Sequence, residues 1–577
     1  MTNGTGQGIM LRHRIGQIFS TFSGVGLMLG TLFLAASLTP TLVPRTYLTQ
    51  GALAGASFAA GYGIGVFCRW IWAYMELPEP AGRTRRVVNA VLMGLCTIIA
   101  LLFLWRAAEW QNSIRTVMDM EPVDSAHPLQ VCAVAAITFM VLFALARLFA
   151  FSLRRISSRL RRFLPRRVAN VLGVAMAIVL FWSISNDVFF RLALNILDSS
   201  FRQYDALIEA DRPQPLAQSR TGSPASLIVW EELGRAGREF IASGPGGDDI
   251  AAFTGRPARD PVRVYVGLRA AETPAARAHL ALEELLRVGA FDRSALVVIT
   301  PTGTGWIDPA AMDAVEYLHG GDIASVAMQY SYLSSPLSLI VQPEYGAEAA
   351  RALFLEVYDY WTKLPKDRRP KLYLHGLSLG ALNSERSAQL FEMISDPITG
   401  ALWSGPPFES SLWRAITNNR NPGSPAWLPV FRDGSLVRFM DQNGAVLPAD
   451  TAWGPMRVVY LQYASDPVTF FDYRDLYRPP AWLEHPRGSD VSPDLRWYPI
   501  VTMLQLALDM AVSTTTPVGH GHVYAPEHYV DAWLQVTDRQ GWSADDIIRL
   551  KRHLTQAMTE ALSDDNGSED AYDNRGG

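Results

Sequence analysis

The fold of this chain is decided by residues 371–386, Lys-Leu-Tyr-Leu-His-Gly-Leu-Ser-Leu-Gly-Ala-Leu-Asn-Ser-Glu-Arg. Its first five residues favour a short strand, Gly-Leu-Ser-Leu-Gly follows, and the remainder is compatible with a helix. Strand, turn and helix are the context of a nucleophile elbow, in which a strained turn exposes the hydroxyl of Ser378. Gly376 and Gly380 would let neighbouring backbone approach without a Cβ clash. The Gly-x-Ser-x-Gly pattern alone arises by chance in about one chain in five of this length, so its position between strand and helix is what makes it informative.

Strand and helix patterns alternate on both sides of this stretch. Such alternation is typical of a mostly parallel sheet with helices on its faces. We therefore predict an α/β fold with strands at 262–268, 294–300, 326–330, 371–375, 400–404 and 457–463. Helices are predicted at 274–288, 344–364, 499–512 and 526–536.

An elbow serine needs a base to remove its proton and an acid to hold that base. In chains with this kind of elbow, the acid and then the histidine follow the serine, each on a loop after a later strand. Asp466 follows the strand predicted at 457–463, in Ala-Ser-Asp-Pro-Val, where Pro467 ends the strand. We predict Asp466 as the acid, with a plain turn residue as the alternative.

The histidine is predicted within residues 518–524, Val-Gly-His-Gly-His-Val-Tyr. His520 and His522 alternate with glycines, and only one of them can be the base. We slightly favour His520 because of its Pro-x-Gly-His context. His522 stays the alternative, and a structural role is open for either one.

An oxyanion hole needs two preorganised backbone N–H groups. We predict the first at Leu379, directly after the serine. The second is predicted at Thr302 or Gly303, in the loop Pro-Thr-Gly-Thr-Gly-Trp that follows a strand. A plain turn is the alternative, whereas a phosphate loop would need a lysine and a spacing that are missing. Residues 417–455 and 476–497 are predicted as insertions that cover the site.

The first two hundred residues carry most of the apolar excess of the chain. Five segments are long enough to cross a bilayer, which takes about 20 residues. They lie at 19–38, 51–74, 87–105, 129–151 and 168–184. No Asp, Glu, Lys or His lies in the middle of a segment, which favours an anchor or platform over a transporter.

Arginines are concentrated in every second connection between these segments. They precede the first segment, lie between the second and third, and are most frequent between the fourth and fifth. The alternate connections at 39–50 and 107–127 have few arginines, and the second of them is acidic. By the positive-inside rule, the N-terminus faces the cytoplasm and the region after the fifth span lies outside.

The length of 577 residues exceeds what one core can organise, and the net charge of −4 gives no basis for nucleic-acid binding. All three cysteines lie in the apolar N-terminal part, so no disulfide or Cys-based metal site is expected downstream. We predict no metal and no cofactor, and the oligomeric state stays open. The predicted parts are a transmembrane domain at 1–197, a connecting region at 198–260, a catalytic domain at 261–562 and a disordered acidic tail at 563–577.

Five motifs together resemble a bacterial family of membrane-anchored α/β-hydrolase proteins, with a multi-span N-terminal domain. They are Gly234-Arg-Ala-Gly-Arg238, Val264-Tyr-Val-Gly267, Pro301-Thr-Gly-Thr-Gly-Trp306, His375-Gly-Leu-Ser-Leu-Gly380 and Gly519-His-Gly-His-Val-Tyr524. The resemblance extends over nearly the whole chain. It implies an α/β-hydrolase-like sheet behind an all-α membrane domain, and a Ser-Asp-His hydrolase, but no particular substrate.

The expected function is an integral membrane serine hydrolase of the esterase or lipase type, acting outside the cytoplasmic membrane. Its expected partners are the lipid bilayer and an ester or lipid-like small molecule, which would form an acyl-enzyme. Two alternatives stay open. One is an envelope acyltransferase with the same triad, and the other is a non-catalytic membrane scaffold with a hydrolase fold.

Overall fold

The computed structural model describes residues 23–183 and most of 205–573, without 206, 209–211, 334–337, 339–342, 389–392, 448–450 and 538. The chain divides into two compact units. We call the first the helical unit, which contains Met1–Arg191, Phe471–Leu483 and Ser489–Val512. We call the second the sheet unit, which contains Leu192–Phe470, Glu484–Gly488 and Ser513–Gly577.

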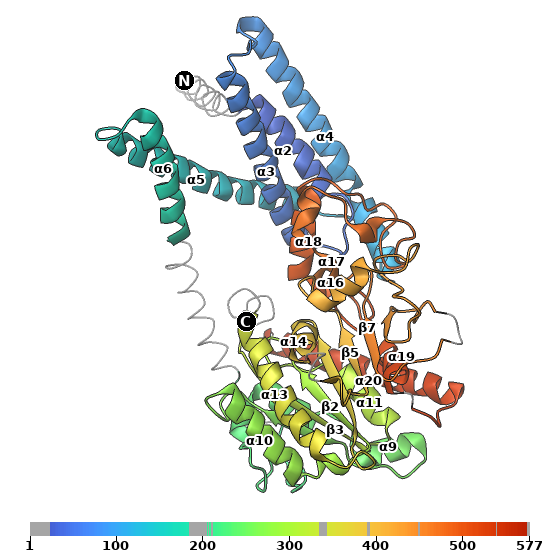
Figure 1. Cartoon of the computed structure of the whole chain (residues 1–577). Helices are drawn as coiled ribbons and strands as arrows, with labels where there is room; N and C mark the ends of the chain where they lie inside the picture. The colour runs from blue at the N-terminus through green and yellow to red at the C-terminus, as the bar shows by residue number, and fades with distance from the viewer. Residues whose placement is uncertain are drawn as a thin grey trace. The chain divides into compact units, whose positions relative to one another are not determined.

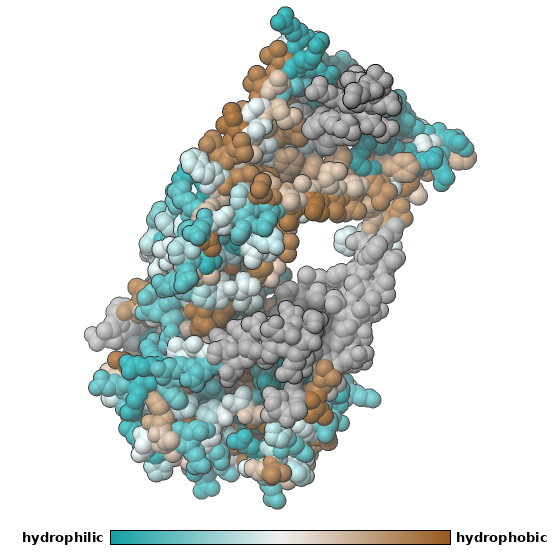
Figure 2. All heavy atoms as spheres, turned by 180° about the vertical axis from the view of Figure 1, so that it is seen from behind, coloured by the Kyte–Doolittle hydropathy of each residue, from teal (hydrophilic) through white to brown (hydrophobic). Residues whose placement is uncertain are grey.

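The helical unit begins, in its described part, with helices α2 (Gly24–Ser37), α3 (Tyr47–Tyr74), α4 (Gly82–Val117), α5 (Pro128–Leu160) and α6 (Arg166–Ser183) (Figure 1). Four of them, α3 to α6, are long and apolar enough to cross a membrane. Helix α2 has 14 described residues, and the start of the span predicted at 19–38 lies outside the described residues. Large apolar side chains such as Trp105 and Leu129 are exposed, and brown surface covers much of these helices in Figure 2.

Glycines let helix α3 pack closely against both α2 and α5. A Cβ atom on Gly65 would lie 2.6 Å from the Cα of Gly26 in α2. A Cβ atom on Gly55 would lie 2.5 Å from the carbonyl oxygen of Ala135 in α5. Close approach of this kind is how helices associate in lipid, where van der Waals packing replaces the hydrophobic effect.

The helical unit also contains a segment from the second half of the chain. It includes η4 (Tyr473–Leu476), η5 (Ala481–Leu483) and α18 (Val501–Ala511), and α18 packs against α2 and α3. The prediction of one catalytic domain over 261–562 therefore differs from the structure at residues 471–483 and 489–512. The reason is a tertiary one, because Asp509 of α18 finds its charge partner in Arg45, between α2 and α3.

The sheet unit is built on a seven-stranded sheet in the order β1-β3-β2-β4-β5-β7-β6, with every neighbouring pair parallel. Its strands are β1 (Val262–Val266), β2 (Ala295–Thr300), β3 (Ile323–Met328), β4 (Lys371–Leu377), β5 (Gly400–Ser404), β6 (Val437–Met440) and β7 (Arg457–Leu461). Nearly every strand residue is buried, as expected when helices cover both faces of a parallel sheet. The predicted α/β class is confirmed.

Two groups of packed helices flank the sheet (Figure 1). The first consists of α10 (Pro274–Arg287), α13 (Pro343–Lys363) and α14 (Leu379–Ser387), and the second of α11 (Pro309–Leu318), α19 (Pro526–Thr537) and α20 (Ala544–Asp573). Shorter helices are η2 (Trp230–Leu233), α8 (Gly234–Ala242), α9 (Gly247–Thr254), η3 (Ala290–Asp292), α16 (Ser411–Asn418), α17 (Pro467–Phe470) and η6 (Ser513–Thr515). Helix α8 contacts β1, and the region predicted as connecting, 198–260, belongs to the sheet unit.

Two stretches differ from the elements that the sequence predicts. Strand β6 lies inside the stretch predicted as an insertion at 417–455, because four residues are too few to show a strand pattern. Its Phe439 stacks on Tyr460 of β7, with 5.1 Å between ring centroids. The tail predicted as disordered continues helix α20 as far as Asp573, since an existing helix extends easily where no proline stops it. Residues 574–577 lie outside the described residues.

Candidate active site

Ser378 lies between the last residue of β4 and the first residue of α14. Its backbone has φ 57° and ψ −125°, a conformation that non-glycine residues adopt only under strain. The Ser378 N–H donates to the carbonyl oxygen of Ser404, which ends the neighbouring strand β5 (2.9 Å). The structure thus places the predicted nucleophile on a strand–turn–helix elbow at the carboxyl edge of the parallel sheet.

The two elbow glycines allow the backbone to fold tightly around Ser378. A Cβ atom on Gly376 would lie 2.4 Å from the carbonyl carbon of Gly380. A Cβ atom on Gly380 would lie 2.2 Å from the carbonyl oxygen of Thr300, the last residue of β2. The second contact brings the predicted oxyanion loop, which follows Thr300, beside the first turn of α14.

Asp466 lies in the loop after β7 and is completely buried. Its Oδ1 accepts a hydrogen bond from the Val468 N–H (2.9 Å), and its Oδ2 accepts one from the Thr469 hydroxyl (3.3 Å). A buried carboxylate is tolerated only when such donors replace its lost hydration. The structure therefore holds this side chain in one orientation, with Oδ2 directed at the histidine loop.

The histidine that reaches Asp466 is His522. Its Nδ1 lies 2.7 Å from Asp466 Oδ2, and both side chains are buried. The sequence-based preference for His520 is therefore wrong. The backbone of His520 instead pairs with Val523 in a short antiparallel bridge, and its carbonyl accepts a hydrogen bond from Thr516 (2.7 Å).

Local glycine geometry decides between the two histidines. Gly521 has φ 56°, and its N–H donates to the hydroxyl of Ser465, the neighbour of the acid (2.8 Å). A Cβ atom on Gly521 would lie 2.5 Å from Thr516 Oγ1, so only glycine fits this turn. The turn directs the residue after it, His522, toward Asp466. This choice depends on a contact between distant residues, which the Gly-His-Gly-His pattern does not contain.

The imidazole of His522 lies beside the elbow. A Cβ atom on Gly405 would lie 2.6 Å from His522 Cε1, and Gly405 directly follows Ser404, the residue that accepts the Ser378 N–H. His522 Nε2 is buried and has no hydrogen-bond partner among the described residues. The structure thus brings His522, in the loop between η6 and α19, to Asp466 after β7 and beside the elbow of Ser378 after β4.

Only part of the predicted oxyanion hole agrees with the structure. The Leu379 N–H opens helix α14, where the first N–H groups lack partners within the helix. The Thr302 N–H already donates to the Trp306 carbonyl (3.0 Å), which rules it out as an oxyanion donor. Its loop is further fixed by the Tyr265 hydroxyl, which donates to the Gly305 carbonyl (2.8 Å). Gly303 stays the predicted second donor.

Sequence reasoning gave no role to Tyr524, which contacts the acid. The Tyr524 hydroxyl donates to Asp466 Oδ2 (2.8 Å), the same oxygen that faces His522. Burial, followed by the nearby Asp466 charge, raises the pKa of Tyr524 well above its usual value, so the hydroxyl keeps its proton. Its position two residues after His522 was a signal, because alternate residues of an extended segment share a face.

Asp308 is a second neighbour that the sequence analysis missed. It caps helix α11 by accepting the Ala310 N–H (3.0 Å). Burial raises the pKa of Asp308 to about 6, against the opposing influence of Tyr529, the Ala310 N–H and the charge of His522. The Asp-Pro pair at the start of a helix was its only sequence signal, and that signal indicates a cap rather than a site.

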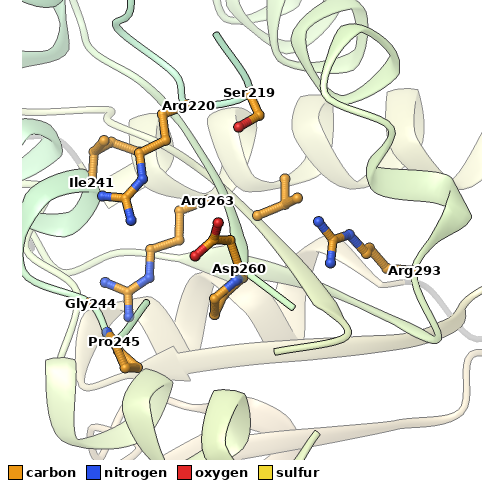
Figure 3. Close-up of a pocket in the computed structure, with 10 residues that line it drawn as sticks. Ser219, Arg220, Ile241, Gly244, Pro245, Asp260, Arg263 and Arg293 are labelled. Atoms are coloured by element: carbon orange, nitrogen blue, oxygen red, sulfur yellow. The ribbon is translucent and has the colours of Figure 1, made fainter. Parts of the chain in front are cut away.

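A separate hollow lies at the amino end of β1 and is lined by Arg220, Asp260, Arg263 and Arg293 (Figure 3). Parallel strands place their amino ends at the edge opposite to Ser378, so this hollow is not part of the elbow site. Among the described residues, no group of three or more His, Cys, Asp or Glu side chains could hold a metal ion.

Comparison with known proteins agrees with the fold of the sheet unit. A family model described as the alpha/beta-hydrolase family matches residues 262–550, which is half of the chain. A second model, described as the N-terminus of the same family, matches residues 38–245. Searches of curated proteins and of solved structures return no match. The chain therefore belongs to the alpha/beta-hydrolase family.

Proposed function

We propose that the protein is a serine hydrolase of the esterase or lipase type. The observation that carries this proposal is the buried contact of 2.7 Å between His522 Nδ1 and Asp466 Oδ2, beside a serine on a strained elbow. Nucleophile, base and orienting acid are the three groups that acyl transfer through a serine requires. They follow one another in the order that this kind of elbow predicts.

The proposed reaction proceeds through an acyl-enzyme. Asp466 holds the proton of the neutral imidazole on Nδ1, which leaves Nε2 of His522 to accept the proton of the Ser378 hydroxyl. The Ser378 Oγ attacks the ester carbonyl, and the N–H groups of Leu379 and Gly303 stabilise the oxyanion. His522 then gives the proton to the leaving alcohol. Water then gives a proton to the same nitrogen and attacks the acyl-enzyme; His522 returns this proton to Ser378 Oγ as the bond to the acyl group breaks and the acid leaves.

The helical unit is proposed as a membrane anchor. Four helices of suitable length and apolar composition support this role. The arginine-rich ends of α4 and α5 support a cytoplasmic position for those connections. If the segment at 19–38, which contains α2, is the fifth span and the N-terminus is inside, the sheet unit would work outside the cytoplasmic membrane, close to lipid.

Labelling with a fluorophosphonate probe tests the nucleophile and the base. We expect the wild-type chain to be labelled and Ser378→Ala to lose all labelling. Ser387→Ala is the matched control, because its hydroxyl lies in the same helix and donates to the Ser384 carbonyl (2.8 Å). We expect His522→Gln to slow labelling at least about 10³-fold, since an unactivated serine is a poor nucleophile.

His520→Gln separates the two histidines in the same assay. Its labelling rate should stay within about tenfold of wild type, because the base itself is kept. Unchanged labelling of Ser378→Ala would exclude the proposed nucleophile. A larger loss in His520→Gln than in His522→Gln would exclude the proposed base. No labelling of the wild type, together with no turnover of a broad ester panel, would favour a scaffold role.

A further inference from the structure

The chain between the proposed acid and the proposed base leaves the sheet unit and returns to it. Phe471, which begins the part assigned to the helical unit, follows Asp466 by five residues. Val512, which ends it, precedes His522 by ten residues. We call residues 471–483 and 489–512, which belong to the helical unit, the excursion. Both of its ends are therefore attached directly to the two loops that form the Asp466–His522 contact.

The excursion is held on the helical unit by a buried ion pair. The guanidinium of Arg45, in the connection between α2 and α3, donates to Asp509 Oδ1 from Nε (3.0 Å) and Nη2 (2.7 Å). Both side chains have no solvent exposure. Asp509 Oδ2 also accepts hydrogen bonds from the Thr41 hydroxyl and from the Leu42 N–H (3.3 Å).

Further polar contacts fix the same segment in register. The Gln505 side chain donates to the Thr39 carbonyl (3.2 Å), and the backbone carbonyl of Gln505 accepts from Arg45 (3.4 Å). The Ser492 hydroxyl lies 2.8 Å from the hydroxyl of Ser113, which belongs to helix α4. These bonds have strict directions, whereas apolar packing of α18 would tolerate sliding. A buried ion pair is weak evidence for stability, and fixing a register is its best-attested use.

The backbone of His522 is hydrogen-bonded to the residue that directly follows the excursion. The carbonyl of Ser513, the first residue back in the sheet unit, accepts the His522 N–H (3.1 Å). The Thr516 hydroxyl bonds to the Ser513 carbonyl (3.2 Å) and to the His520 carbonyl (2.7 Å). A displacement of Ser513 would therefore be transmitted to the imidazole that faces Asp466.

We propose that Arg45 and Asp509 are positioning residues for His522. They fix α18 on the helical unit, and through Ser513 they keep the histidine loop in register with Asp466. The inference rests on the proposed function, because it requires His522 to act as the base. It makes the activity of the sheet unit depend on helices that are more than three hundred residues away in sequence from the histidine.

Fluorophosphonate labelling of the full chain in membranes tests this role. Arg45→Gln and Asp509→Asn should slow labelling of Ser378 by at least about tenfold, because displacements near 1 Å cost factors of 10–100. Arg45→Lys keeps the charge but loses the two-pronged bond to Asp509, so labelling should slow by about threefold. Ester turnover should fall mainly in kcat, with KM changed less. Thermal unfolding, measured in parallel, shows whether each variant is folded.

Gly55→Ala is the matched control for disturbance of the helical unit. Its Cβ atom would lie closest to Ala135 and Thr138 of α5, which are not part of the excursion. We expect a lower unfolding temperature and a wild-type labelling rate. If the Gln and Asn variants do not fold, the slower labelling of folded Arg45→Lys carries the test.

Two results would overturn the positioning role. One is a wild-type labelling rate in folded Arg45→Gln and Asp509→Asn, or in folded Arg45→Lys when it is the only folded variant. The other is a decrease in the labelling rate of Gly55→Ala that is as large as the decrease in these variants, at a similar unfolding temperature. Failure of the proposed function is distinguishable, because the wild-type chain itself would then not be labelled at Ser378.

Discussion

At the scale of single residues, the site is centred on the Asp466 carboxylate. Four donors converge on it: the Val468 N–H, the hydroxyls of Thr469 and Tyr524, and His522 Nδ1. Hydrogen bonds to a charged acceptor are about twice as strong as neutral ones, and burial increases their influence. The number of donors on Oδ2 therefore sets how strongly this oxygen can hold a protonated imidazole.

Removal of the Tyr524 hydroxyl tests how strongly the donors on Asp466 Oδ2 influence His522. In Tyr524→Phe, the Asp466 carboxylate has one donor fewer and should stabilise the protonated form of His522 more strongly. The base must be neutral to act, so the acidic limb of the pH–rate profile for labelling should move to higher pH. The plateau rate should stay within about tenfold of wild type.

Tyr317→Phe is the matched control for that measurement. It removes the hydroxyl of a buried tyrosine in helix α11, which lies 3.0 Å from His553 Nε2. Its pH–rate profile should coincide with that of the wild type. An unmoved acidic limb in Tyr524→Phe would show that this hydroxyl has no influence on the base.

At the scale of elements, the elbow helix α14 contains a buried acid that the proposed reaction does not use. Burial raises the pKa of Glu385 to about 8, although the Tyr460 hydroxyl, 3.1 Å away, opposes the rise. In the unfolded chain this group has its ordinary pKa near 4.5. Between pH 4.5 and about pH 8, Glu385 is therefore protonated in the folded state and ionised in the unfolded state. Its contribution to stability is complete below pH 4.5 and is lost as pH rises through about 8.

Glu385→Gln should remove this pH dependence. Relative to wild type, the free energy of unfolding of the variant should increase between pH 5 and pH 8 by an amount on the order of 3–4 kcal/mol. Thermal unfolding of the purified chain at both pH values measures the difference. Glu348→Gln, at an exposed position of α13, should show no such change. Equal pH responses of Glu385→Gln and wild type would mean that the acid is ionised in the folded state.

At the scale of the whole molecule, the two units combine a hydrolase fold with apolar helices. The arginine distribution predicts that the sheet unit lies outside the cytoplasmic membrane. A membrane-impermeant fluorophosphonate should therefore label Ser378 equally in intact and in permeabilised cells. Ser378→Ala supplies the background in both samples. Labelling only after permeabilisation would reverse the proposed orientation and leave the nucleophile assignment intact.

The sequence by itself determined what depends on local pattern. The elbow at Ser378, the parallel strands and the apolar helices follow from residue periodicity and from glycine spacing, because these act over a few residues. It also predicted Asp466, since a proline ends the strand next to it. Such features need no knowledge of distant contacts.

Only the tertiary structure decided what depends on residues far apart in the chain. His522 rather than His520 faces Asp466 because Gly521 bonds to Ser465, across more than fifty residues. The Thr302 N–H was excluded by a bond that closes its own loop. The return of α18 to the helical unit depends on one aspartate whose partner, Arg45, lies 464 residues away. Buried charges must find partners wherever the fold supplies them, and no local pattern shows where that is.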